Sequence, residues 1–102
     1  MEDKEVMPYI LEMVTRVLMY HGVRPGCLGW YELLNCGAAA ALSMKNGKAP
    51  SPNRIVMDFA MAAGTTQLNA WQRMRRALRG AGWDVTVAEA ISDLGNVGWV
   101  LR

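Results

Sequence analysis

Breaks rich in glycine and proline divide this sequence of 102 residues into segments with helical period. The breaks fall at residues 22–26, 46–52 and 63–65 and at Gly80. Between them, apolar side chains recur every three or four residues, which is the spacing of one buried face of an α-helix. A chain of this length has room for one core and not for a second. We therefore predict one all-α domain over residues 1–102, a compact bundle of about five to six helices.

The first two predicted helices precede the loop at residues 46–52. The first begins with Asp3 as its cap and ends at His21. The second spans residues 30–44, and its middle, residues 37–41, contains only glycine and alanine, so another helix can approach it closely. We interpret His21 as a C-terminal cap or as a side chain at the edge of the core.

Two short helices with a tight turn between them come next. The third predicted helix spans residues 53–62, with Ser51 as its cap and Pro52 as its first residue. The fourth spans residues 66–79, starts with one of two threonines as its cap and ends at Gly80. Its inward stripe consists of Ala70, Trp71, Met74, Ala77, Leu78 and Ala81. Two short helices joined by a turn that contains glycine are the signature of a helix-turn-helix.

Residues 83–102 allow two predictions. Residues 83–87 alternate like a strand, and residues 98–101 can pair with them in a winged arrangement. Residues 86–94 also have the apolar spacing of one short capped helix, which Gly95 ends. We favour the helix, and therefore a helix-turn-helix domain without a wing.

Basic side chains are concentrated in the middle third of the chain. The whole sequence has a net charge of +2, whereas residues 45–79 alone carry +6 and the segments on either side carry −2 each. The basic residues of this third are Lys45, Lys48, Arg54, Arg73, Arg75, Arg76 and Arg79, and its only acidic residue is Asp58. Such asymmetry is expected of a surface that contacts nucleic acid.

The outward face of the fourth predicted helix carries side chains that read DNA. Asparagine and glutamine bond to adenine, and arginine bonds to guanine, in the major groove. Threonines at the start of the helix offer hydroxyl and backbone N–H groups to a phosphate. An ordinary solvated helix includes glutamate, and this one contains no acidic residue. The predicted contacts are Thr65, Thr66, Asn69, Gln72, Arg73, Arg75, Arg76 and Arg79, with Lys45, Lys48 and Arg54 on the flanking backbone. We predict sequence-specific binding of double-stranded DNA by a transcriptional regulator, with a homodimer on DNA as one form.

The sequence does not predict metal binding, catalysis or membrane insertion. His21, Cys27 and Cys36 lack zinc-ligand spacing and supply only three ligands. Because both cysteines have apolar neighbours, such as Leu28 and Ala38, we interpret them as buried core thiols. An enzyme is not expected, because the single histidine has no nearby carboxylate pair and no glycine-rich phosphate loop follows a strand. We likewise expect no cofactor and no small-molecule substrate. No apolar run reaches the roughly 18 residues of a membrane span, and the acidic start is unlike a secretion signal, which predicts a cytoplasmic protein.

The order of these features resembles the C-terminal DNA-binding effector domain of the sporulation stage-zero response regulator family. The matching features are Gly22-Val23, Gly29-Trp30-Tyr31, Asp58-Phe59-Ala60, Thr65-Thr66 with the arginine-rich helix, and residues 90–100. The resemblance covers about residues 10–100. It implies a compact all-α fold without a wing that binds duplex DNA to regulate transcription.

The chain departs from that family where bases are read. The matching positions hold Asn69, Trp71, Gln72 and Arg75, and only Arg75 keeps the family's residue type. We therefore expect a different site preference. Full-length members also carry a receiver domain that is phosphorylated on aspartate and promotes dimerisation. These 102 residues do not include it, so regulation by phosphorylation is not carried over.

The alternative is a protein-interaction module on the same fold that has lost specific DNA binding. Four tryptophans and eight methionines suit an adaptable apolar surface. The position of Trp71 discriminates between the two functions. Burial of its side chain favours DNA binding, whereas exposure in an apolar patch favours a protein partner.

Overall fold

The computed structural model describes residues 2–45, 47 and 49–100, and in these ranges the chain is all-helical. The helices are α1 (Asp3–Tyr20), α2 (Trp30–Lys45), α3 (Pro52–Ala63), α4 (Gln67–Ala81), α5 (Val87–Gly95) and α6 (Val97–Val100). The described ranges contain no strand, so the predicted all-α class is confirmed and residues 83–87 do not pair with residues near the C-terminus. None of the helices in these ranges is long and apolar enough to cross a membrane.

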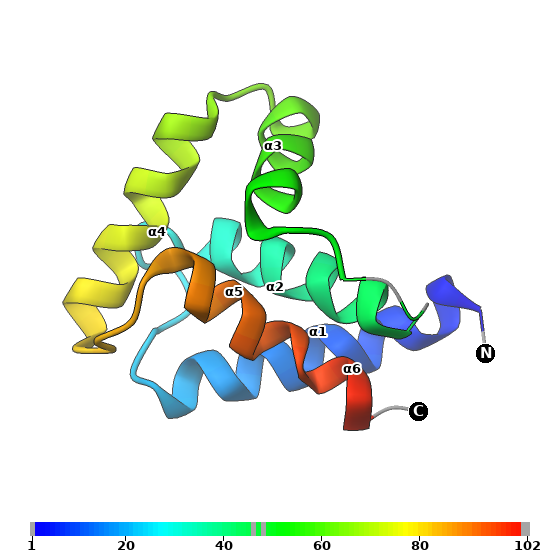
Figure 1. Cartoon of the computed structure of the whole chain (residues 1–102). Coiled ribbons are helices and arrows are strands. Elements are labelled where there is room, and N and C mark those ends of the chain that lie inside the picture. Colours follow the sequence, from blue (N-terminus) through cyan, green and yellow to red (C-terminus); the bar gives the residue numbers. More distant parts are fainter. Residues whose placement is uncertain (1, 46, 48, 101–102) are drawn as a thin grey trace.

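Helix α2 is the centre of the bundle and packs against every other helix (Figure 1). Its small residues make this possible. A Cβ atom added to Gly37 would lie 2.8 Å from the Cβ of Leu94 on α5. In turn, a Cβ on Gly95 would lie 2.8 Å from the Cβ of Ala40. The narrow middle of α2 that the sequence predicts therefore receives α5 at close range.

Side-chain caps fix where three helices start. The Ser51 hydroxyl accepts a hydrogen bond from the Arg54 backbone N–H, and Pro52 is the first residue of α3, as predicted. The Thr66 hydroxyl caps α4 in the same way. Thr86 begins α5 with a reciprocal capping box, in which Glu89 bonds back to the start of the helix. The cap of α1 is Glu2, and it makes no side-chain hydrogen bond, so the prediction of Asp3 in this role is wrong.

The end of α4 also differs from the sequence prediction. The helix continues through Gly80 to Ala81 and ends at Gly82, whose φ of +73° places it in the left-handed region. The chain then turns at Trp83, whose buried indole stacks on the imidazole of His21 with ring centroids 3.8 Å apart. His21 follows the last turn of α1, so its predicted place at a helix end and at the edge of the core is confirmed.

The two cysteines lie in different environments. Cys36 is fully buried on α2, as predicted, whereas Cys27 is exposed, so its assignment to the core is wrong. The prediction rested on its apolar neighbour Leu28, but this leucine is itself 42% exposed. Cys27 and Leu28 belong to the loop between α1 and α2, which lies on the surface of the bundle.

Candidate nucleic-acid interface

Helix α4 presents one polar face to solvent because its apolar face is packed into the bundle. A turn of three residues, 64–66, joins α3 to α4, and the two helices pack against each other (Figure 1). Gly64 allows the turn with a φ of +70°. Ala70, Met74 and Leu78 are buried. The opposite side of the helix is consequently turned away from the core.

This outward face is uniformly polar and basic over its middle and C-terminal turns. Asn69, Gln72, Arg75, Arg76 and Arg79 are all exposed, and α4 contains no acidic residue. Among the described residues, none of these three arginines forms an ion pair. The same five side chains, together with Arg73 and Leu28, line a shallow recess of about 370 Å³. The structure therefore brings most of the predicted contacts together on one surface.

Hydrogen bonds organise the first turn of α4. The Thr66 hydroxyl oxygen accepts from the Asn69 backbone N–H at 3.0 Å, and the Asn69 side-chain amide donates to the Thr65 hydroxyl at 2.9 Å. Asn69 is thus held by two exposed threonine contacts. Its amide oxygen and second amide hydrogen remain available, and both hydroxyl hydrogens can be donated to an anion.

Arg73 is not on the outward face in the way the sequence predicts. Its Nε donates to Oε2 of Glu32 at 2.5 Å, and the Arg73 side chain is only 40% exposed. The Glu32 side chain is 8% exposed, and its second oxygen has no hydrogen-bond partner in the described residues. Burial, and secondly the charge of Glu32, raise the pKa of the nearby Cys36 thiol to about 12. Arg73 therefore joins α4 to the first turn of α2 across the edge of the core.

Glu32 is a residue that the sequence analysis missed. A signal was present, because Glu32 is the only acidic residue of α2 and lies four residues before Cys36, which was expected in the core. A carboxylate at such a position needs a cationic partner. The sequence alone does not say that this partner lies 41 residues away.

The predicted flanking contacts are less well placed. Arg54 is exposed on α3 and pairs with Asp58 one turn later, with Nε 3.2 Å from Oδ1. Its charge is therefore partly neutralised in the free protein. Lys48 lies outside the described residues. Lys45 is the last residue of α2, and the structure does not describe the position of its side chain.

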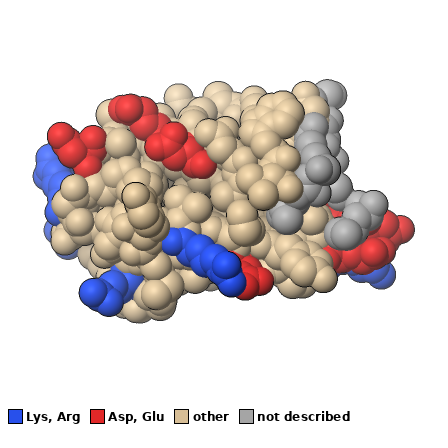
Figure 2. Space-filling view, turned by 90° about the horizontal axis from the view of Figure 1, so that it is seen from below, with Lys and Arg blue, Asp and Glu red and all other residues tan. Residues whose placement is uncertain are grey.

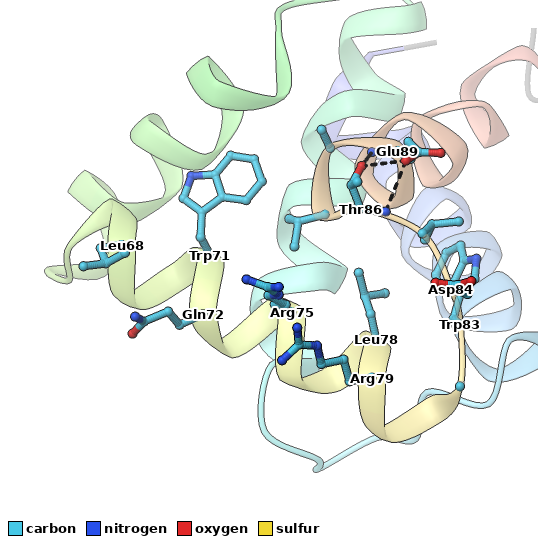
Figure 3. Close-up of a pocket in the computed structure, with 14 residues that line it drawn as sticks. Leu68, Trp71, Gln72, Arg75, Leu78, Arg79, Trp83, Asp84, Thr86 and Glu89 are labelled. Atoms are coloured by element: carbon cyan, nitrogen blue, oxygen red, sulfur yellow. Dashed lines mark hydrogen bonds between the residues drawn. The ribbon is translucent and has the colours of Figure 1, made fainter.

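A larger groove, of about 890 Å³, lies between α4 and the start of α5 (Figure 3). Trp71 forms part of its wall and is only partly buried, and Leu68 is 66% exposed. Arg75 and Arg79 line the α4 side, whereas Asp84 and Glu89 line the other side. Trp71 accordingly has an intermediate exposure, neither fully buried nor free of the core.

The face below the bundle in Figure 1 does not show the charge pattern of α4. In Figure 2, basic and acidic side chains there lie near one another among wide uncharged areas. On α1, for example, Arg16 pairs with Glu12 at 2.7 Å, and both side chains are exposed. The face seen in Figure 2 therefore carries charges of both signs, unlike the outward face of α4.

No protein-family model, curated protein or solved structure matches the chain.

Proposed function

We propose that this chain binds double-stranded DNA, with α3, the turn at residues 64–66 and α4 acting as a helix-turn-helix without a wing. The observation that carries the proposal is the outward face of α4, which combines one asparagine, one glutamine and three unpaired arginines with no acidic residue. An α-helix fits the major groove, and these side chains have the hydrogen-bonding groups that base edges and phosphates require. In this role the chain is a cytoplasmic regulator of transcription, as its resemblance to the sporulation effector domain also implies.

Each contact has a distinct role in this proposal. Asn69 and Gln72 lie one turn apart on the exposed face and bond to base edges. Arg75, Arg76 and Arg79 neutralise phosphates or bond to guanine. The two threonines at the helix start bind one phosphate, assisted by the positive end of the helix dipole. Arg73 is assigned instead to the ion pair with Glu32, so it orients α4.

Salt dependence is the first test. Fluorescence anisotropy with a short labelled duplex is expected to show binding at about 50 mM salt, with affinity falling by about 0.9 log unit per log unit of salt for each phosphate contacted. Arg76→Gln is expected to reduce that slope by about 0.9. The matched control is Arg16→Gln on α1, which removes the same charge far from α4 in sequence and should leave the slope unchanged. Absence of binding at low salt, with an intact circular-dichroism spectrum, would refute the proposal.

Sequence specificity needs a second experiment. Selection from random duplexes is expected to enrich one motif if Asn69 and Gln72 read bases. Enrichment of an inverted repeat indicates a homodimer on DNA, because a two-fold protein dimer binds two half-sites related by the same symmetry. If selection enriches no motif but binding depends on salt, the chain is a nonspecific DNA-binding domain, and its proposed role as a sequence-specific regulator is refuted.

The groove beside α4 favours a second candidate function, a protein-interaction module. Its apolar wall includes the exposed Leu68 and the partly buried Trp71. Substitution Leu68→Asn separates the two functions. It leaves the arginines in place, so salt-dependent DNA binding should persist, whereas docking of a protein on the apolar wall should weaken.

A further inference from the structure

The loop that joins α1 to α2 lies along the second half of α4. A Cβ atom on Gly22 would lie 3.2 Å from the carbonyl oxygen of Ala81, at the end of α4. A Cβ on Gly29 would collide with the carbonyl oxygen of Arg73 and lie 2.9 Å from the Cβ of Ala77. Because the start of the loop meets the end of α4 and the end of the loop meets its middle, loop 22–29 and α4 run antiparallel at backbone contact.

The loop and α4 share the surface that the arginines line. Leu28 is 42% exposed and borders the recess of about 370 Å³ together with Arg73 and Arg76. Arg24, four residues earlier, is exposed, and among the described residues it has no ion-pair partner. It is the only charged residue between positions 22 and 29. The loop that lies along this flank of α4 therefore carries one unpaired positive charge.

The segment that borders the other flank of α4, residues 83–89, carries charges of the opposite sign. Asp84 and Glu89 line the groove of about 890 Å³ on the side opposite α4 (Figure 3). Glu89 is engaged in the capping box of α5, and Asp84 is exposed in the loop after α4. A phosphate on this side would approach two carboxylates, whereas a phosphate on the loop side would approach Arg24.

We propose that the DNA-contacting surface extends from α4 onto loop 22–29, where Arg24 binds a backbone phosphate, and that Asp84 and Glu89 exclude the duplex backbone from the α5 side. This inference rests on the proposed DNA binding and adds the side of α4 on which the sugar-phosphate backbone runs. The exposed Leu28 packs against deoxyribose between the two basic elements. Charges within a Debye length of about 10 Å at 0.1 M salt act on the duplex, so both flanks contribute.

Charge substitutions test this side preference by anisotropy. Arg24→Gln is expected to weaken binding and to lower the salt slope by about 0.9, as loss of one phosphate contact does. Asp84→Asn is expected to strengthen binding about twofold at low salt, because one repulsive charge is removed. The matched controls on α1, Arg16→Gln and Glu12→Gln, should change neither quantity.

A position-specific probe gives an independent readout. Cys27 is exposed on the same loop and Cys36 is buried, so a thiol-reactive iron chelate labels the native protein at Cys27. The labelled protein is expected to cleave a bound duplex. The control carries the chelate on Arg16→Cys in a Cys27→Ser background and should not cleave.

The outcomes separate the two proposals. If the unmodified chain does not bind duplex DNA, the proposed function and this inference both fail. If it binds and Arg76→Gln lowers the salt slope, but Arg24→Gln matches Arg16→Gln and the Cys27 probe does not cleave, only the extension onto the loop is refuted. Unchanged affinity in Asp84→Asn overturns exclusion on the α5 side.

Discussion

Replacement of Arg73 by methionine tests whether this arginine holds α4 in place. The substitution keeps a long side chain but leaves the Glu32 carboxylate, 8% exposed, without its cation. Removing one partner of a buried ion pair costs roughly 3–5 kcal/mol. Because the Arg73 side chain is 40% exposed and water reaches part of it, we take about 2–3 kcal/mol for this pair. For a domain of this size that loss lowers Tm by roughly 10–20 °C.

The assay is thermal unfolding followed by circular dichroism. The matched control is Arg76→Met on the same helix, which is exposed and unpaired among the described residues and should change stability by less than about 0.5 kcal/mol. The double variant Glu32→Met/Arg73→Met should recover most of the loss, because no uncompensated charge stays buried. If Arg73→Met is as mild as Arg76→Met, or if the double variant is no more stable than Arg73→Met, the positioning role of this pair is refuted.

Three other substitutions and treatments probe the packing of the same region. Gly29→Ala should lower the free energy of unfolding in urea by more than Gly26→Ala does. Both glycines have positive φ (+93° and +86°), which costs an alanine about 1–2 kcal/mol, but only a Cβ at position 29 also collides with the Arg73 backbone. Equal losses in the two variants would contradict this close approach. Native protein at neutral pH should incorporate one equivalent of iodoacetamide, at Cys27, and a second only after unfolding; rapid labelling of Cys36 would contradict its burial. Burial raises the pKa of the Cys36 thiol from 9.0 to about 12. Its contribution to stability is therefore complete below pH 9, and above pH 9 the free energy of unfolding falls by up to about 1.4 kcal/mol per pH unit. Cys36→Ala should make the free energy of unfolding depend less on pH between pH 9 and 12, and an unchanged dependence would contradict this linkage.

Local signals in the sequence predict the helices well. Ser51 before Pro52 and a threonine before Gln67 are start signals that depend only on neighbouring residues, and the structure has caps at both. Four members of the predicted inward stripe of α4 are buried and the other two, Trp71 and Ala81, are partly buried against the core, because side chains three and four residues apart share a face. The end of α4 is missed by two residues, because Gly80 is tolerated inside the helix and Gly82 provides the left-handed cap.

The candidate site is predicted less completely because it depends on contacts between distant segments. Helical period predicts Arg73 on the outward face, and only the packing of α2 against α4 brings its side chain to Glu32. The exposure of Cys27 likewise depends on the path of loop 22–29 over the surface, which apolar neighbours in the sequence do not specify. The contribution of Leu28 to the recess has the same origin.

The contacts at Arg73 have a consequence for the motions of α4. The backbone of this residue abuts Gly29 and its side chain is bound to Glu32, so the middle of the helix is held at two points by two segments. The first turn has only the small Ala70 in the core and otherwise relies on exposed threonine hydrogen bonds around Asn69. Exposed hydrogen bonds open more readily than packed ones, so amide exchange should be fastest in the first turn and slow from Arg73 onward. A helix that is anchored at its middle and mobile at its start adjusts to a partner through its first turn.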